Sequence, residues 1–135
     1  IEDDDDSSSS ELQRGFYVSS DREWIVDSGA TCSMSPSKEG LQDFHATSGK
    51  VVIGDNSQVT VQGAGILGLI PDGQGGTYPS KVLYVPDLGF HLLSVSELCK
   101  LGLLVEFFED RFWVQDRASG KVVCEKEVQN MVSTS

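Results

Sequence analysis

Short runs of β-favouring residues, separated by turn residues, follow one another along almost the whole chain. The runs are rich in Val, Ile, Thr, Tyr, Phe and Trp, the residues that fit a pleated and half-buried surface. Between them stand clusters such as Gly54-Asp55-Asn56-Ser57, which is typical of the turn of a hairpin. The runs occupy residues 16–18, 24–26, 51–53, 58–61, 66–70, 78–85, 103–107, 112–115 and 122–124. This pattern predicts an all-β domain, and the architecture that we expect is a small closed β-barrel.

Two stretches depart from the β pattern. Ser94 is followed three residues later by Glu97, which is the pattern of a capping box at the start of a helix. Apolar residues then share one helical face, and Gly102 is placed to end the helix. One short helix is therefore predicted near residues 94–102. Residues 32–48 are mixed and polar, and we expect them to form a loop with at most one turn of helix.

Charge divides the chain of 135 residues into an acidic segment and one domain. The opening residues are mostly acidic or Ser, which predicts a disordered linker over residues 1–14. The folded domain is expected over residues 15–125, and a polar tail over residues 126–135. The net charge is −11, and 6 of the 21 acidic residues lie in the linker. Because the 10 Lys and Arg residues are scattered, a nucleic acid is not the expected partner.

The three cysteines, Cys32, Cys99 and Cys124, lack the spacing of a metal site, and their number is odd. We therefore expect reduced thiols in a cytoplasmic protein, with no metal ion and no cofactor. No apolar run reaches the length that spans a membrane and no signal peptide is recognised, so we expect no membrane partner. His45 and His91 have no recognisable nucleophile or third ligand beside them and are expected to be structural or exposed.

An acidic residue, Asp27, directly follows the apolar run at 24–26 and precedes the small residues Ser28, Gly29 and Ala30. Taken alone, Asp-Ser-Gly is most often a turn at the end of a strand. The other interpretation is a carboxylate presented at the end of a buried strand, where small residues let backbone or a second chain approach closely. The apolar run before Asp27 favours the second interpretation without deciding between them.

The order of the parts after Asp27 carries more information. The chain resembles the retropepsins in having apolar-apolar-Asp-Ser-Gly-Ala at 25–30, a flap-like hairpin at 50–62, strands through 66–85 and an apolar step before a short helix. It is most similar to the Gag-Pol polyproteins of copia-type LTR retrotransposons. The segments that carry this similarity are Trp-Ile-Val-Asp-Ser-Gly-Ala-Thr at 24–31, Gly-Asp-Asn-Ser at 54–57, Val-Leu-Tyr-Val-Pro-Asp-Leu at 82–88 and Leu-Leu-Ser-Val-Ser-Glu-Leu at 92–98. The resemblance covers roughly residues 24–121, and it is the combination that is specific.

The resemblance implies a homodimeric aspartic endopeptidase that cleaves its own Gag-Pol polyprotein. Asp27 would supply one of two catalytic carboxylates, and Asp27 of the partner chain would supply the other. Ser28 would make a hydroxyl contact across the dimer, although it could equally be a local turn former. Gly29 would offer its backbone to the substrate, Ala30 would pack beneath it, and Thr31 would belong to the same active-site loop.

The hairpin at 51–61 would be a flap that folds over an extended peptide, and the peptide would bind as an added strand. Val52, Ile53, Gly54, Asp55 and Asn56 would be its substrate-binding residues. An ordinary surface hairpin is the alternative, because Asp55 and Asn56 are more polar than the usual Gly-rich flap tip. The implied location is the cytoplasm, within the virus-like particles of the retrotransposon.

Several departures from the retropepsin pattern favour a second hypothesis. Retropepsins commonly carry a further Asp in the active-site loop, paired with an Arg at the start of the helix, whereas this chain has Thr31 and Val95 in those places. Ser94 stands where Gly is usual, and residues 107–124 add a hairpin beyond the expected end. The alternative is therefore a catalytically silent retropepsin-like β-barrel that acts as a scaffold or dimerisation module.

Overall fold

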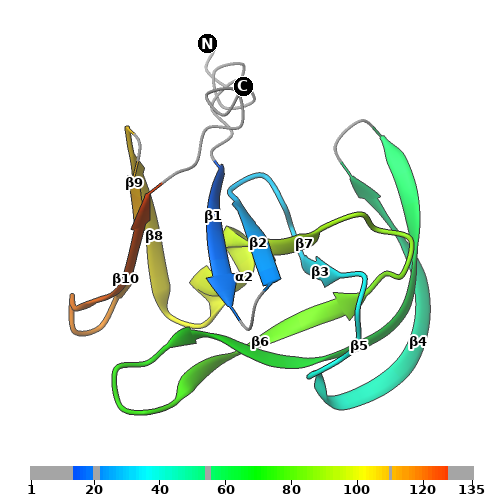
Figure 1. Cartoon of the computed structure of the whole chain (residues 1–135), viewed down its shortest axis with the longest axis horizontal. Coiled ribbons are helices and arrows are strands. Elements are labelled where there is room, and N and C mark those ends of the chain that lie inside the picture. The colour runs from blue at the N-terminus through cyan, green and yellow to red at the C-terminus, as the bar shows by residue number, and fades with distance from the viewer. Residues whose placement is uncertain (1–13, 20–21, 54–55, 110, 128–135) are drawn as a thin grey trace.

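The computed structural model describes residues 14–19, 22–53, 56–109 and 111–127, and these residues form an almost entirely β structure (Figure 1). The strands are β1 (Arg14–Ser19), β2 (Arg22–Asp27), β3 (Ser33–Ser35), β4 (Gln42–Ile53), β5 (Ser57–Pro71), β6 (Thr77–Tyr84), β7 (His91–Ser94), β8 (Leu103–Phe108), β9 (Arg111–Asp116) and β10 (Val122–Glu127). One short helix, α2 (Val95–Lys100), is found in the described part of the chain. The prediction of an all-β domain with one short helix near 94–102 is confirmed.

The main sheet has seven strands in the order β1-β2-β7-β3-β6-β5-β4. Strand β7 lies between β2 and β3, parallel to β2 and antiparallel to β3, although β2 and β3 are neighbours in the sequence. The register pairs Trp24 with His91 and Asp27 with Ser94. The short loop from β2 to β3 therefore passes over the end of β7, at the point where α2 begins.

Helix α2 has the capping expected from the sequence. Ser94 is the N-cap residue, and its side-chain oxygen accepts a hydrogen bond from the backbone N–H of Glu97. Gly102 follows the helix with φ +86°, a left-handed conformation that glycine adopts without steric cost. Leu98 is fully buried, and its burial fixes α2 against the core.

The expectation of a loop over residues 32–48 is wrong. Residues 33–35 form β3, whose neighbours are β6 and β7, and β4 begins at Gln42. Residues 42–50 are exposed on both faces, so they show no alternation of apolar and polar residues that would predict a strand. Backbone pairing with β5 holds this segment extended instead, with irregular register between Gln42 and Gly49.

Strands β8, β9 and β10 form a second, antiparallel sheet in the order β10-β9-β8. Its inner face packs on the larger hydrophobic core, to which the main sheet and α2 also contribute. Trp24, Leu93, Leu98 and Phe112 are each exposed by 1% or less and form the centre of this core. Since a fully buried side chain of this size stabilises by about 1.5–3 kcal/mol, these residues join the two sheets firmly.

The main sheet is strongly curved but open. Its edges are β1 and β4, and the pairings among the described strands do not join these two edges. The long strands β4, β5 and β6 sweep around one side of the molecule in Figure 1. A closed barrel needs hydrogen bonds between its first and last strands, and the described strands do not supply them, so the predicted closure is not shown.

The predicted linker and tail largely fall outside the described residues, which begin at Arg14 and end at Glu127, so these boundaries remain predictions. Across the described ranges no helix is both long and apolar enough to cross a membrane.

Candidate active site

Asp27 is the last residue of β2, and its position there follows from the burial of that strand. Trp24 and Val26 are each 1% exposed, so the strand that carries Asp27 is fixed in the core. Asp27 itself is only 6% exposed. A carboxylate this buried requires hydrogen-bond donors, and one of them is the backbone N–H of Gly29, 2.8 Å from Asp27 Oδ1.

The loop after Asp27 turns sharply back over the sheet. The N–H of Ala30 donates to the carbonyl of Asp27 at 3.4 Å, a long hydrogen bond that closes the turn. Ser28, Gly29 and Thr31 are exposed, whereas Ala30 is half-buried and packs on the smaller hydrophobic core. The predicted active-site loop thus has the buried Asp27 at its start and three exposed residues, Ser28, Gly29 and Thr31.

A pocket of about 230 Å³ brings the predicted loop and the predicted flap together. Asp27 lines it with loop residues 29–32, Met34 and Leu92 line it from β3 and β7, and residues 51–53 line it from the end of β4. Val51 and Ile53 pack on the same small apolar core as Ala30. The pocket therefore places one carboxylate among apolar side chains, beneath the end of a hairpin.

Only some of the five residues predicted to bind substrate in the flap lie at the pocket. Val52 and Ile53 line the pocket beside Asp27. Gly54 and Asp55 lie outside the described residues. Asn56 is exposed, does not line the pocket, and has a left-handed φ of 72° in a turn where its N–H donates to the Ile53 carbonyl at 2.8 Å. Asn tolerates this conformation better than most residues, so Asn56 has a structural reason for its place.

Val51, at the start of the predicted flap, lines the pocket, whereas sequence reasoning assigned no site role to Cys32, Met34 or Leu92, which also line it. Leu92 was noted only as part of an apolar step before the helix. The signal for it was indirect, because β7 reaches the pocket only by inserting between β2 and β3.

Hydrogen bonds of Ser94 join the loop to the start of the helix. The Ser94 hydroxyl donates to the Ala30 carbonyl at 2.7 Å and accepts from the Glu97 N–H at 3.1 Å. The Ser94 N–H donates to Ser33 Oγ at 2.9 Å. Ser94 and Ser33 are 0% and 1% exposed, so both serine side chains are shielded from water.

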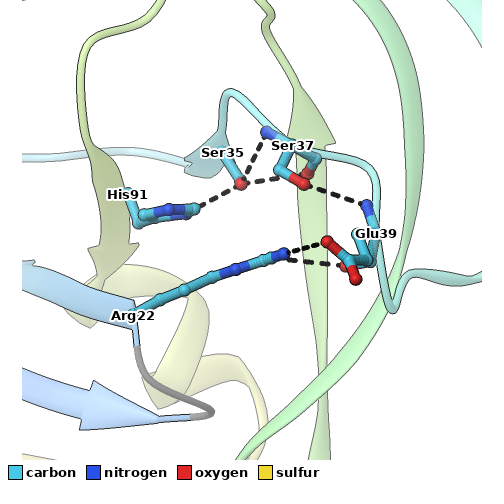
Figure 2. Close-up of polar contacts among 5 residues, drawn as sticks. All are labelled: Arg22, Ser35, Ser37, Glu39 and His91. Carbon is cyan, nitrogen blue, oxygen red and sulfur yellow. Dashed lines mark hydrogen bonds and ion pairs between the residues drawn. The ribbon is translucent and has the colours of Figure 1, made fainter.

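The opposite end of β2 carries a separate polar cluster, shown in Figure 2. Ser35 Oγ lies 2.9 Å from His91 Nδ1, and Arg22 forms an ion pair with Glu39 at 2.7 Å. The His91 ring also stacks on Trp24, with ring centroids 4.9 Å apart. Burial, and then the charge of Arg22, lower the pKa of His91 below its ordinary value. This agrees with a structural role for His91.

Beside this cluster lies a pocket of about 250 Å³, lined by Arg22, Trp24, Glu39 and the middle of β5. It is similar in size to the pocket at Asp27, but its two charged groups form an ion pair with one another. We therefore place the candidate active site at Asp27. No group of three or more metal-binding side chains occurs within the residues that the structure describes.

These features define an all-β domain with a buried acid at the end of a buried strand and the end of a hairpin beside it. The chain belongs to the family of the Pol polyprotein beta-barrel domain, whose model matches residues 24–103. That range begins within β2 and ends at the start of β8, so it contains the whole candidate site, while most of the second sheet lies beyond it.

Two relatives from Arabidopsis thaliana place the domain in a retrotransposon Pol region. The chain is 37% identical over 101 residues to the retrovirus-related Pol polyprotein from transposon RE2, a match that covers 72% of the chain. It is 31% identical over 104 residues to the retrovirus-related Pol polyprotein from transposon RE1, covering 75% of the chain. Each match spans 7% of the length of the relative.

Proposed function

We propose that this domain is a retropepsin-type, homodimeric aspartic endopeptidase that cleaves peptide bonds of its own Gag-Pol polyprotein. The observation that carries the proposal is the placement of Asp27: a nearly buried carboxylate at the end of a core strand, in a pocket that also includes the end of a hairpin. Membership of the Pol polyprotein family supports it, because such a polyprotein has to be cut into its parts. The expected place of action is the cytoplasm, within virus-like particles.

The chemistry would need two chains. The sequence has one Asp-Ser-Gly motif, so a second carboxylate has to come from a symmetric partner. Two carboxylates about 3 Å apart cannot both be ionised cheaply and share one proton, for which aspartic proteases are the standard case. One Asp27 would take a proton from a water molecule as its oxygen attacks the scissile carbonyl carbon. The other would donate a proton to the carbonyl oxygen. The first Asp27 would then pass the proton it took from water to the amide nitrogen as the C–N bond breaks and the amine leaves.

The pocket supports an extended peptide as the substrate. Leu92, Met34 and the side chains at 51–53 offer an apolar surface next to Asp27, which suits an apolar side chain beside the scissile bond. Closing the hairpin tips over the peptide would exclude water and strengthen the interactions of the carboxylates. In this proposal Val52 and Ile53 contact the peptide directly.

Replacing the carboxylate tests the catalytic assignment. A Gag-Pol precursor with Asp27→Asn should be cleaved about 10²–10⁴-fold more slowly, because general acid–base catalysis contributes that much. Asp87→Asn, which changes an exposed carboxylate outside the pocket, is the matched control and should be cleaved at the wild-type rate. Time courses of precursor processing on denaturing gels measure both.

Continued processing of the folded Asp27→Asn precursor at the wild-type rate would remove Asp27 from the mechanism. If wild-type precursor, shown to be folded, is not cleaved at any concentration, the domain is the catalytically silent scaffold instead.

A further inference from the structure

We propose that Ser94 is a positioning residue for Asp27, because it fixes the active-site loop against the start of α2. The inference rests on the proposed function, since it assigns Ser94 a part in the same reaction. Ser94 touches neither the pocket nor Asp27 Oδ1 in any contact described above, so its effect is exerted through the backbone of the loop.

The hydrogen bonds of Ser94 use both of its polar groups. Its hydroxyl proton is directed at the Ala30 carbonyl, 2.7 Å away, while a lone pair of the same oxygen accepts the Glu97 N–H. Its own N–H donates to Ser33 Oγ, beyond the other end of the loop. One side chain and one amide therefore hold the loop from Ala30 to Ser33 to the first turn of α2.

Asp27 depends on the part of the loop that Ser94 holds. The carboxylate accepts the N–H of Gly29, and Gly29 shares a peptide bond with Ala30. Within the loop, the hydrogen bond from the Ala30 N–H to the Asp27 carbonyl is long, at 3.4 Å, and restrains this peptide weakly. Without the Ser94 hydroxyl, the Ala30 carbonyl loses its short hydrogen bond and the Gly29–Ala30 peptide can rotate. The donor to Asp27 Oδ1 then moves away.

The register of the sheet explains why Ser94 is the residue that does this. Strand β7 pairs in parallel with β2, which places Ser94 directly beside Asp27. Small displacements of a catalytic group are costly, because a shift of about 1 Å can reduce a rate about 100-fold. We expect Ser94→Ala to lower kcat about 10- to 100-fold while KM changes less than about threefold, because the substrate pocket keeps its lining.

Two substitutions separate loss of the hydroxyl from general damage to the core. Ser94→Thr keeps the hydroxyl at an extended N-cap position that Thr also fills well, so it should restore most of kcat. Ser80→Ala is the matched control. Ser80 is 1% exposed like Ser33, but its hydroxyl has no hydrogen-bond partner among the described residues. Removing that hydroxyl should leave kcat and KM unchanged.

The experiment measures kcat and KM with a peptide that carries a natural cleavage junction, for the full chain and its Ser94→Ala, Ser94→Thr, Ser33→Ala and Ser80→Ala variants. Circular dichroism confirms that each variant is folded. Amide hydrogen exchange at Gly29 and Ala30, followed by NMR, reports the loop independently of catalysis. Exchange should accelerate at least about tenfold in Ser94→Ala and remain unchanged in Ser80→Ala.

A kcat of Ser94→Ala within twofold of wild type, alongside an inactive Asp27→Asn, overturns the positioning role. So does an equal loss in Ser94→Thr and Ser94→Ala, because the hydroxyl would then not be responsible. Should Ser94→Ala not fold, Ser33→Ala replaces it, because it removes the other hydrogen bond between Ser94 and the loop. A smaller loss of kcat at unchanged KM is then expected, and an unchanged kcat together with unchanged exchange at Gly29 and Ala30 overturns the proposal. If no variant and no wild-type protein cleaves the peptide, the proposed function fails. Exchange at Gly29 and Ala30 then decides whether Ser94 holds the loop.

Discussion

His91 and Ser94, at the two ends of β7, contact opposite ends of β2. Ser94 lies beside Asp27, where the loop and the pocket are, and His91 lies beside Trp24, three residues earlier. Both are held by serine side chains of β3, Ser33 for Ser94 and Ser35 for His91. The polar groups of β7 thus fix β2 and β3 relative to one another at both ends.

The protonation of His91 should make stability depend on pH. Its pKa is lowered in the folded protein, first by burial and then by the charge of Arg22, from an ordinary value of 6.5. The unfolded chain therefore binds a proton more readily as the pH falls through 6.5, and the folded state loses stability there. Below the folded pKa the loss from His91 is complete, and above 6.5 its contribution is fully present.

Urea unfolding of the wild type and of His91→Gln at pH 7.5 and 5.5 checks this. The free energy of unfolding should fall more steeply with acidification in the wild type than in His91→Gln. His45→Gln changes an exposed histidine and should keep the wild-type slope. Equal slopes in all three proteins would show that His91 does not carry the dependence.

Strand β5 contains glycines that are required by packing. A Cβ on Gly65 would lie 2.8 Å from Leu41 Cβ and 3.0 Å from the carbonyl oxygen of Gln42. Real Cβ atoms essentially never approach another atom as closely as the contact with Leu41 Cβ, and that atom is fixed to the backbone, so β4 or the chain before it would have to move. Gly65 therefore lets the start of β4 curl tightly over β5, which shapes the long hairpin.

Gly65→Ala should lower the free energy of unfolding by about 1–3 kcal/mol, the usual cost of overpacking. Gly89→Ala is the control, because a Cβ at Gly89 meets nothing within 4 Å and Gly89 does not have a left-handed φ. It should be neutral or stabilise by up to about 1 kcal/mol, since it restricts the unfolded chain. Chemical denaturation measures both, and equal effects of the two substitutions would refute the packing argument.

At the scale of the whole molecule, we expect peptide cleavage to require a dimer of two chains. Wild type and Asp27→Asn can be mixed in equal amounts at fixed total concentration and left to exchange subunits. Random pairing leaves two intact carboxylates in about one quarter of the dimers, so activity should fall to about a quarter of that of pure wild type.

Independent monomers would retain about half of the activity in this mixture, because each wild-type chain would act alone. A peptide-cleavage assay at several total concentrations distinguishes the two outcomes. Mixing wild type with Asp87→Asn, which changes an exposed carboxylate, should leave full activity and controls for the mixing itself. A remaining activity of one half would rule out the shared dyad.

Local sequence signals predicted the parts of this domain well. The capped helix was readable from Ser94 and Glu97, and the strand before Asp27 from its run of apolar residues, because capping and strand propensity depend on near neighbours. The same signals failed for β4. Its first nine residues are exposed, and backbone hydrogen bonds to β5, rather than an apolar face, keep it extended.

Asp27 could be singled out from the chain alone, but its surroundings could not. Strand β7 brings Leu92 into the pocket and Ser94 to the loop by inserting between β2 and β3, and the hairpin brings residues 51–53 over them. Backbone groups form the same hydrogen bonds between strands whatever the side chains. Local strand propensity therefore does not predict which strand pairs with which. The choice of partner depends on which apolar faces can be buried together, and that is settled only when the whole chain folds.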